Sequence, residues 1–66
     1  MTGISLTAKQ AGLVASVISG TVENDTVRIF SYDEYVIVQV DDDKGKTVVD
    51  YRVNEDGTWE DRLLEV

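Results

Sequence analysis

The chain has 66 residues, and its thirteen acidic and six basic side chains give a net charge of −7. This charge opposes binding to nucleic acid phosphates or anionic lipid and favours a basic protein as partner. The absence of cysteine and histidine excludes disulfides, thiolate nucleophiles and imidazole metal ligands. A domain this small then depends on packing and association for its stability.

The first predicted element is a helix over residues 6–19. Thr7 and Gln10 have the spacing of a capping box, and Gly20 follows as a stop signal. At about 100° per residue, one arc of this helix is apolar and the usual charged face is missing. The arc opposite the apolar one holds only small, uncharged side chains: Ala8, Ala11, Gly12, Ala15 and Ser19. We therefore expect a helix that is covered on both sides.

Four strands are predicted after the helix, because runs rich in Val, Ile, Tyr and Thr alternate with turn residues. They span residues 26–32, 35–41, 46–53 and 58–65. Two of the turns have Asp or Asn first and Gly45 or Gly57 fourth, which is typical of a three-residue hairpin loop closed by a left-handed glycine. The sequence thus predicts a single α+β domain, residues 1–66, with one N-terminal helix packed on a four-stranded antiparallel β-meander.

The two glycine turns also set a register for the strands. In that register Asp50 lies opposite Arg62 and Arg52 opposite Glu60, which gives two cross-strand pairs of opposite charge. If Asp33-Glu34 is a two-residue turn, all five aromatic side chains share the other face, and we expect the helix to cover it. These aromatic residues are Phe30, Tyr32, Tyr35, Tyr51 and Trp59. An aliphatic patch is then left uncovered beside the ion pairs: Val27, Ile29, Val36, Val38 and Val40.

The run Asp41-Asp42-Asp43 does not fit an EF-hand loop, because Gly45 falls at the fifth position of such a loop. Successive strand residues point to opposite faces, so the three carboxylates indicate a solvated turn. No glycine-rich phosphate loop is present, and the acidic residues gather at turns and not in a cleft. We therefore expect no enzymatic activity, no catalytic residues, no cofactor and no metal.

The aromatic face could stack exposed bases, but only Arg28 among the basic residues falls on it, so a hydrophobic core is favoured. The apolar stretch of residues 11–18 is too short to cross a bilayer, and no basic segment precedes it as in a secretory signal. We expect a cytoplasmic protein without nucleic acid or membrane partners.

Two functional hypotheses follow. In the first, the protein is a small acidic interaction module that self-associates as a homodimer and modulates or inhibits a basic, nucleic-acid-binding protein. Its dimer interface is either the aliphatic patch or the helix arc of small residues, where Ala8, Gly12, Ala15 and Ser19 allow close approach. The carboxylates predicted to meet that partner are Asp41, Asp42, Asp43, Glu55 and Asp56. In the alternative, the protein is a homo-oligomeric accessory protein whose acidic surface serves only solubility or salt adaptation.

Overall fold

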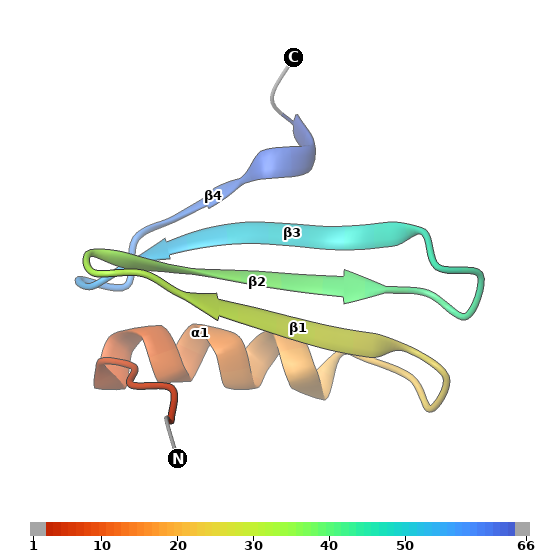
Figure 1. Cartoon of the computed structure of the whole chain (residues 1–66), viewed down its shortest axis with the longest axis horizontal. Helices are drawn as coiled ribbons and strands as arrows, with labels where there is room; N and C mark the ends of the chain where they lie inside the picture. The colour runs from red at the N-terminus through yellow and green to blue at the C-terminus, as the bar shows by residue number, and fades with distance from the viewer. Residues whose placement is uncertain (1–2, 65–66) are drawn as a thin grey trace.

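The computed structural model describes residues 3–64. One helix lies on one face of an antiparallel sheet whose strands follow the chain in the order β1-β2-β3-β4 (Figure 1). The α+β meander predicted from the sequence is therefore confirmed. The elements are α1 (Ala8–Ser19), β1 (Thr26–Ser31), β2 (Tyr35–Asp41), β3 (Thr47–Asn54), β4 (Trp59–Asp61) and the 3-10 helix η1 (Arg62–Leu64).

The last strand is shorter than predicted. Asp61 Oδ1 accepts a hydrogen bond of 3.0 Å from the Leu63 backbone N–H, and this contact turns the chain into η1. Residues 62–64 are therefore not strand, and residue 65 lies outside the described residues. The sheet consequently ends on one side in a strand of only three residues.

The predicted capping box begins α1. The Gln10 backbone N–H donates to Thr7 Oγ1 at 3.2 Å, and the Thr7 N–H donates to Gln10 Oε1 at 2.9 Å. Gly20 ends the helix with a φ of −88°, without the left-handed conformation that glycine often supplies there. The arc of small residues is exposed, so the expectation of a helix covered on both sides is wrong. The sheet covers one side of α1, and no described element lies on the other.

Both glycine turns form as predicted. Gly45 and Gly57 have φ values of 81° and 88°, and no other described residue has a positive φ. The Asp42 N–H donates to the Lys46 carbonyl at 2.8 Å. At the turn between β1 and β2, the Tyr32 N–H donates to the Tyr35 carbonyl at 2.9 Å, which closes the predicted two-residue turn.

A β-bulge between β2 and β3 overturns the predicted assignment of faces. Val40 faces Val49 while the next residue, Asp41, faces Thr47, so Val48 has no partner on β2. Side chains alternate along a strand, and the extra residue therefore exchanges the two faces of β2, and of β1 paired with it, relative to the rest of β3. The helix covers the face without ion pairs, as expected, but β1 and β2 present the opposite side chains to it.

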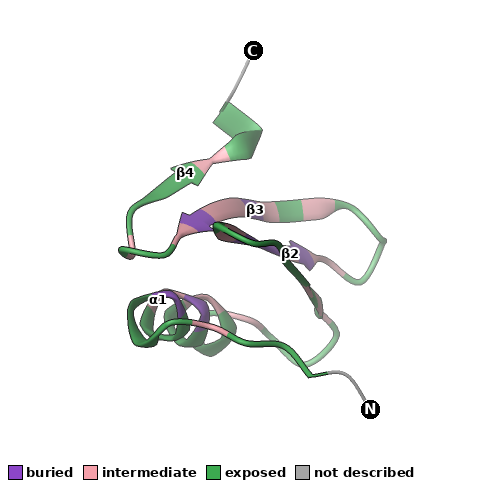
Figure 2. Ribbon diagram, turned by 60° about the vertical axis from the view of Figure 1, so that its left-hand side comes forward, coloured by how far each residue is buried: buried purple, intermediate pink, exposed green. Residues whose placement is uncertain are grey.

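The predicted aliphatic patch consequently lies in and around the core. Val36, Val38 and Val40 are 1%, 0% and 2% exposed, and Val27 and Ile29 are partly buried against the same cluster. Val14 of α1 packs on them. The buried residues lie on α1 and on the two central strands, β2 and β3 (Figure 2). The prediction that this patch is left uncovered is wrong, because the bulge turns it toward α1.

The aromatic residues are likewise divided between the two faces. Tyr51 and Trp59 lie on the helix side, whereas Phe30, Tyr32 and Tyr35 lie on the open side of the sheet. The predicted sharing of one face by all five aromatic residues is therefore wrong, for the same reason. On the open side the Tyr32 and Tyr35 rings stack with their centroids 4.8 Å apart.

Candidate functional site

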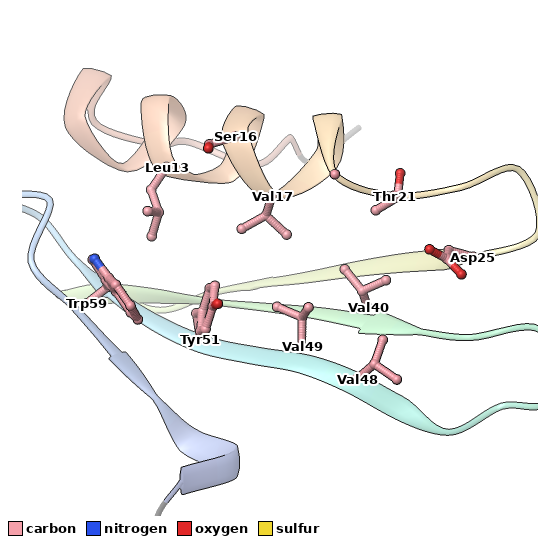
Figure 3. A pocket seen from close by; sticks show the side chains of 11 residues that line it. Leu13, Ser16, Val17, Thr21, Asp25, Val40, Val48, Val49, Tyr51 and Trp59 are labelled. Carbon is pink, nitrogen blue, oxygen red and sulfur yellow. The ribbon is translucent and has the colours of Figure 1, made fainter.

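A groove lies between α1 and the uncovered part of β3 and β4, with a volume of about 350 Å³ (Figure 3). Its origin is a mismatch of widths. An α-helix with its side chains is about 10–12 Å across, whereas the outer strands of a four-stranded sheet lie about 14 Å apart. Because Val14 packs against Val36, Val38 and Val53, the single helix covers the middle of the sheet and leaves the β3–β4 side open.

The walls and floor of the groove are mainly apolar. Leu13 and Val17 reach down from α1, Val49 and Tyr51 form the floor on β3, and Trp59 closes one end from β4 (Figure 3). The Tyr51 and Trp59 rings have centroids 4.9 Å apart at an interplanar angle of 48°.

Trp59 remains 50% exposed although it lies in this concave, apolar surface. Val48, the bulge residue at the rim, is 46% exposed. A half-exposed tryptophan beside a partly buried tyrosine in an apolar hollow is typical of the residues that contribute most to binding another molecule.

One carboxylate lines the groove, and a second lies next to its lining. Asp25 lines the end opposite Trp59 (Figure 3). Asp61 is not a lining residue, but it faces the lining residue Tyr51 across the β3–β4 pair, on the same side of the sheet. The Val22 N–H donates to Asp25 Oδ2 at 3.0 Å, and a backbone N–H also holds Asp61. These hydrogen bonds orient the carboxylates without neutralising their charge, so the apolar groove has acidic margins.

The carboxylates predicted to bind a basic partner are divided between two hairpins at opposite ends of β3 (Figure 1). At one end, Asp41 forms an ion pair with Arg28 at 3.0 Å and accepts a hydrogen bond from Thr47 Oγ1 at 2.7 Å. Asp42 Oδ1 accepts the backbone N–H groups of Lys44 and Lys46, each at 2.9 Å. These two side chains therefore stabilise the sheet and its turn, and of the three residues only Asp43 is exposed.

At the other end, the Glu55 carbonyl accepts a hydrogen bond of 2.9 Å from Thr7 Oγ1, while the Glu55 residue is exposed. Asp56 Oδ1 accepts hydrogen bonds from the Thr58 hydroxyl at 2.6 Å and the Thr58 N–H at 3.0 Å. These two hydrogen bonds, the hydroxyl first, lower the pKa of Asp56 below its ordinary value of 3.8. The structure therefore does not bring the five predicted acidic residues together into one site.

Within residues 3–64, no group of three or more acidic side chains is arranged to hold a metal ion. The α-helix α1 has 12 residues, and no helix in the described part of the chain is long and apolar enough to cross a membrane.

The open face of the sheet carries all three arginines of the chain, Arg28, Arg52 and Arg62. The expectation that only Arg28 would lie beside the aromatic residues there is wrong, again because of the bulge. Arg62 approaches Asp50 to 3.3 Å, as predicted. Arg52 lies opposite Glu60 in the predicted register, but its guanidinium stacks 4.0 Å from the centre of the Tyr35 ring.

The charges on this open face are balanced. Its three arginines are matched by three carboxylates, those of Asp41, Asp50 and Glu60. Stacking of bases on a sheet depends on a positive groove that follows the phosphates. The face therefore lacks the electrostatic component of a nucleic acid surface.

Sequence reasoning placed Tyr51 and Trp59 on the helix side but assigned them to a closed core. The width of the predicted elements was the signal that could have found the groove, since one helix cannot cover four strands.

Comparisons of the chain with models of protein families, with curated proteins and with solved structures gave no match.

Proposed function

We propose that this protein is a small, non-enzymatic interaction module that binds a basic and partly apolar segment of another protein in the groove between α1 and β3–β4. The observation that carries the proposal is the half-exposed Trp59, which lies beside Tyr51 in an apolar hollow. An apolar side chain of the partner would fill the hollow, and its lysine or arginine side chains would meet Asp25 and Asp61.

The net charge of −7 favours a positively charged partner, because it attracts cationic segments over a distance and repels anionic ones. Such attraction between exposed charges weakens as salt is added, since the screening length is about 8 Å at physiological ionic strength. A partner held through the groove therefore dissociates more readily at high salt. In this way the module would modulate or inhibit a basic protein by occupying the surface that the partner uses elsewhere.

Trp59 is the only tryptophan of the chain, so its fluorescence reports directly on the groove. The probe is a synthetic amphipathic peptide of leucine and lysine, compared with a peptide of the same pattern built from leucine and glutamate. We expect the lysine peptide to shift the Trp59 emission to shorter wavelength, with an affinity that falls as salt is raised. Equal effects of the two peptides, or no effect of either, would refute the proposal.

A matched pair of variants tests where the charge acts. Asp61→Asn removes a carboxylate beside the groove, and its amide oxygen can still accept the Leu63 N–H. Asp33→Asn removes an equal charge from the exposed turn between β1 and β2. Removing any one negative charge should weaken binding of the lysine peptide slightly, and we expect only Asp61→Asn to weaken it by more than this. Equal losses of affinity in both variants would contradict a groove site.

A second candidate function is self-association as an accessory homo-oligomer whose acidic surface maintains solubility. It is favoured by the number of large apolar side chains left exposed on a chain of 66 residues. They are Ile4, Ile18, Val22, Phe30, Tyr32, Val48, Trp59, Leu63 and Leu64.

A further inference from the structure

We infer that two copies of this chain associate by pairing their β1 strands edge to edge, antiparallel, so that the two sheets become one. The inference rests on the self-association part of the proposed function and is independent of the groove. It assigns the interface to a strand edge and replaces the buried aliphatic patch that the sequence suggested.

The outer edge of β1 has hydrogen-bonding groups without partners. Because the Tyr32 N–H bonds to the Tyr35 carbonyl, and bonded pairs alternate along an antiparallel ladder, every second residue from Tyr32 bonds to β2. The intervening residues, Val27, Ile29 and Ser31, therefore direct their N–H and C=O groups away from the sheet. No backbone hydrogen bond from elsewhere in residues 3–64 reaches them.

The features that usually protect an edge strand are missing from β1. Its six residues include no proline and no lysine, and its pairing with β2 is regular from Thr26 to Ser31. Its one charge, on Arg28, is engaged by Asp41 at 3.0 Å. The opposite edge differs, because β4 has only three residues and ends in η1. One edge of the sheet is thus blunted by its shortness, and the other is left available for pairing.

The charge distribution favours a second copy of this chain as the partner that pairs with the free edge of β1. β1 carries no carboxylate, although the chain has thirteen acidic residues. Two copies of net charge −7 repel each other over most of their surfaces, and β1 is a segment along which they can approach.

A register centred on Ile29 uses the whole strand. It pairs Ile29 with Ile29 of the second copy and Val27 with Ser31 of the second copy, giving about six new backbone hydrogen bonds from three bonded pairs. The same register puts Arg28 opposite Phe30 of the second copy, on the open face, where Phe30 is 41% exposed. This places a cation beside an aromatic ring at two symmetric positions and opposes no like charges within the strands.

Beyond the ends of the paired strands, Asp25 comes near Asp33 of the second copy. This repulsion is screened by salt, so the dimer should become tighter as ionic strength rises. Binding of a basic partner in the groove has the opposite salt dependence. The two proposals can therefore fail separately.

The experiment measures the dimer dissociation constant by sedimentation across a concentration series, for the wild type and two variants at one exposed position. Phe30→Arg places arginine opposite Arg28 of the second copy, and Phe30→Glu places a carboxylate there. We expect Phe30→Arg to weaken the dimer by about tenfold or more and Phe30→Glu to retain it. A nonspecific effect of net charge would give the reverse order, because the arginine reduces the excess negative charge and the glutamate increases it.

Chemical synthesis supplies a variant that changes no side chain. An N-methyl group on Ile29 blocks the central pair of hydrogen bonds, while the same group on the exposed loop residue Asp43 is the control. We expect only the first to abolish the dimer, and the amide protons of Val27, Ile29 and Ser31 to exchange slowly only in the dimer.

A wild-type chain that is monomeric at every concentration would overturn the inference, as would a dimer that survives N-methylation of Ile29. A monomer that pairs with a foreign extended peptide along β1 would also overturn it, because the occupant would then not be a second copy. A monomer that still binds the lysine peptide through Trp59 would overturn only this inference and leave the groove function standing.

Discussion

Val40 of β2 faces Val49 of β3, although the hairpin that joins these strands would place Val48 opposite Val40 if the ladder were regular. The extra residue is accommodated as a bulge at Val48. Because successive side chains alternate, this offset of one residue decides that Val36, Val38 and Val40 meet the helix. The bulge at this one position thereby determines which face of β2 packs against the helix.

Val38 should be essential for stability. Its side chain is 0% exposed and packs in the cluster with Val14 and Val53, so Val38→Ala leaves a cavity and should cost about 2–3 kcal/mol of unfolding free energy. The control is Val48→Ala, since Val48 is 46% exposed and its loss should change stability by about 0.5 kcal/mol or less. Urea unfolding measures both, and equal losses would mean that the bulge does not assign the faces as described.

Gln10 should link the helix to the sheet. Its side chain is 3% exposed, donates to the Val53 carbonyl at 3.2 Å and accepts the Thr7 N–H at 2.9 Å. Gln10→Met keeps the length but leaves both groups unpaired, at a cost of about 1–3 kcal/mol. Thr7→Ala should cost about 1 kcal/mol through loss of the cap. Because the two residues share hydrogen bonds, the double variant should lose less than the sum of the single losses, and strict additivity in denaturant unfolding would contradict the shared network.

The two hairpin glycines should differ in their tolerance of alanine. Both have positive φ, so either substitution introduces backbone strain of about 1 kcal/mol. A Cβ on Gly57 would also lie 3.0 Å from Lys9 Cβ of α1, whereas a Cβ on Gly45 meets nothing within 4 Å. Thermal unfolding should therefore show a larger drop for Gly57→Ala than for Gly45→Ala. The reverse order would show that α1 does not pack against the β3–β4 turn.

The pKa of Asp56 should depend on the Thr58 hydroxyl. Thr58→Val removes the leading hydrogen bond, so the pKa of Asp56 should rise toward 3.8, while Thr58→Ser should keep it low. Because the folded pKa lies below the unfolded one, the stability from this group is present above the ordinary pKa and is lost as the pH falls through the folded value. Carbon-detected NMR titration of the Asp56 carboxyl group measures the shift, and an unchanged pKa in Thr58→Val would show that the hydroxyl is not its main cause.

The turns and caps could be predicted because each depends on a few adjacent residues. Gly45 and Gly57 supply the left-handed conformation that their hairpins require, and Thr7 with Gln10 forms the capping box. The pairing of β3 with β4 and the Asp50–Arg62 ion pair followed from the Gly57 turn, and the pairing of β1 with β2 followed from the two-residue turn at Asp33-Glu34.

The faces of β2 could not be predicted, because its pattern does not distinguish them. Val36, Ile37 and Val38 are all apolar and all buried, and Val48-Val49 offers a valine to either face of β3. Register is weakly specified where both alternatives bury apolar side chains, so the bulge left no signal in the sequence. The groove was missed for another reason, since the pattern of Tyr51 and Trp59 predicts which way they face but not how far the helix extends over them.

The contacts of Gln10 with Val53, and of Thr7 with Glu55, join residues that are 43 and 48 positions apart in the chain. Neighbouring strands of the meander, by contrast, are joined by short turns. During synthesis α1 therefore leaves the ribosome before the strand that completes its packing, and until β3 has emerged Val14 can pack only on Val36 and Val38 of the β1–β2 hairpin. Since contacts between residues far apart in the chain carry the larger entropic cost of loop closure, complete docking of the helix should follow formation of the hairpins.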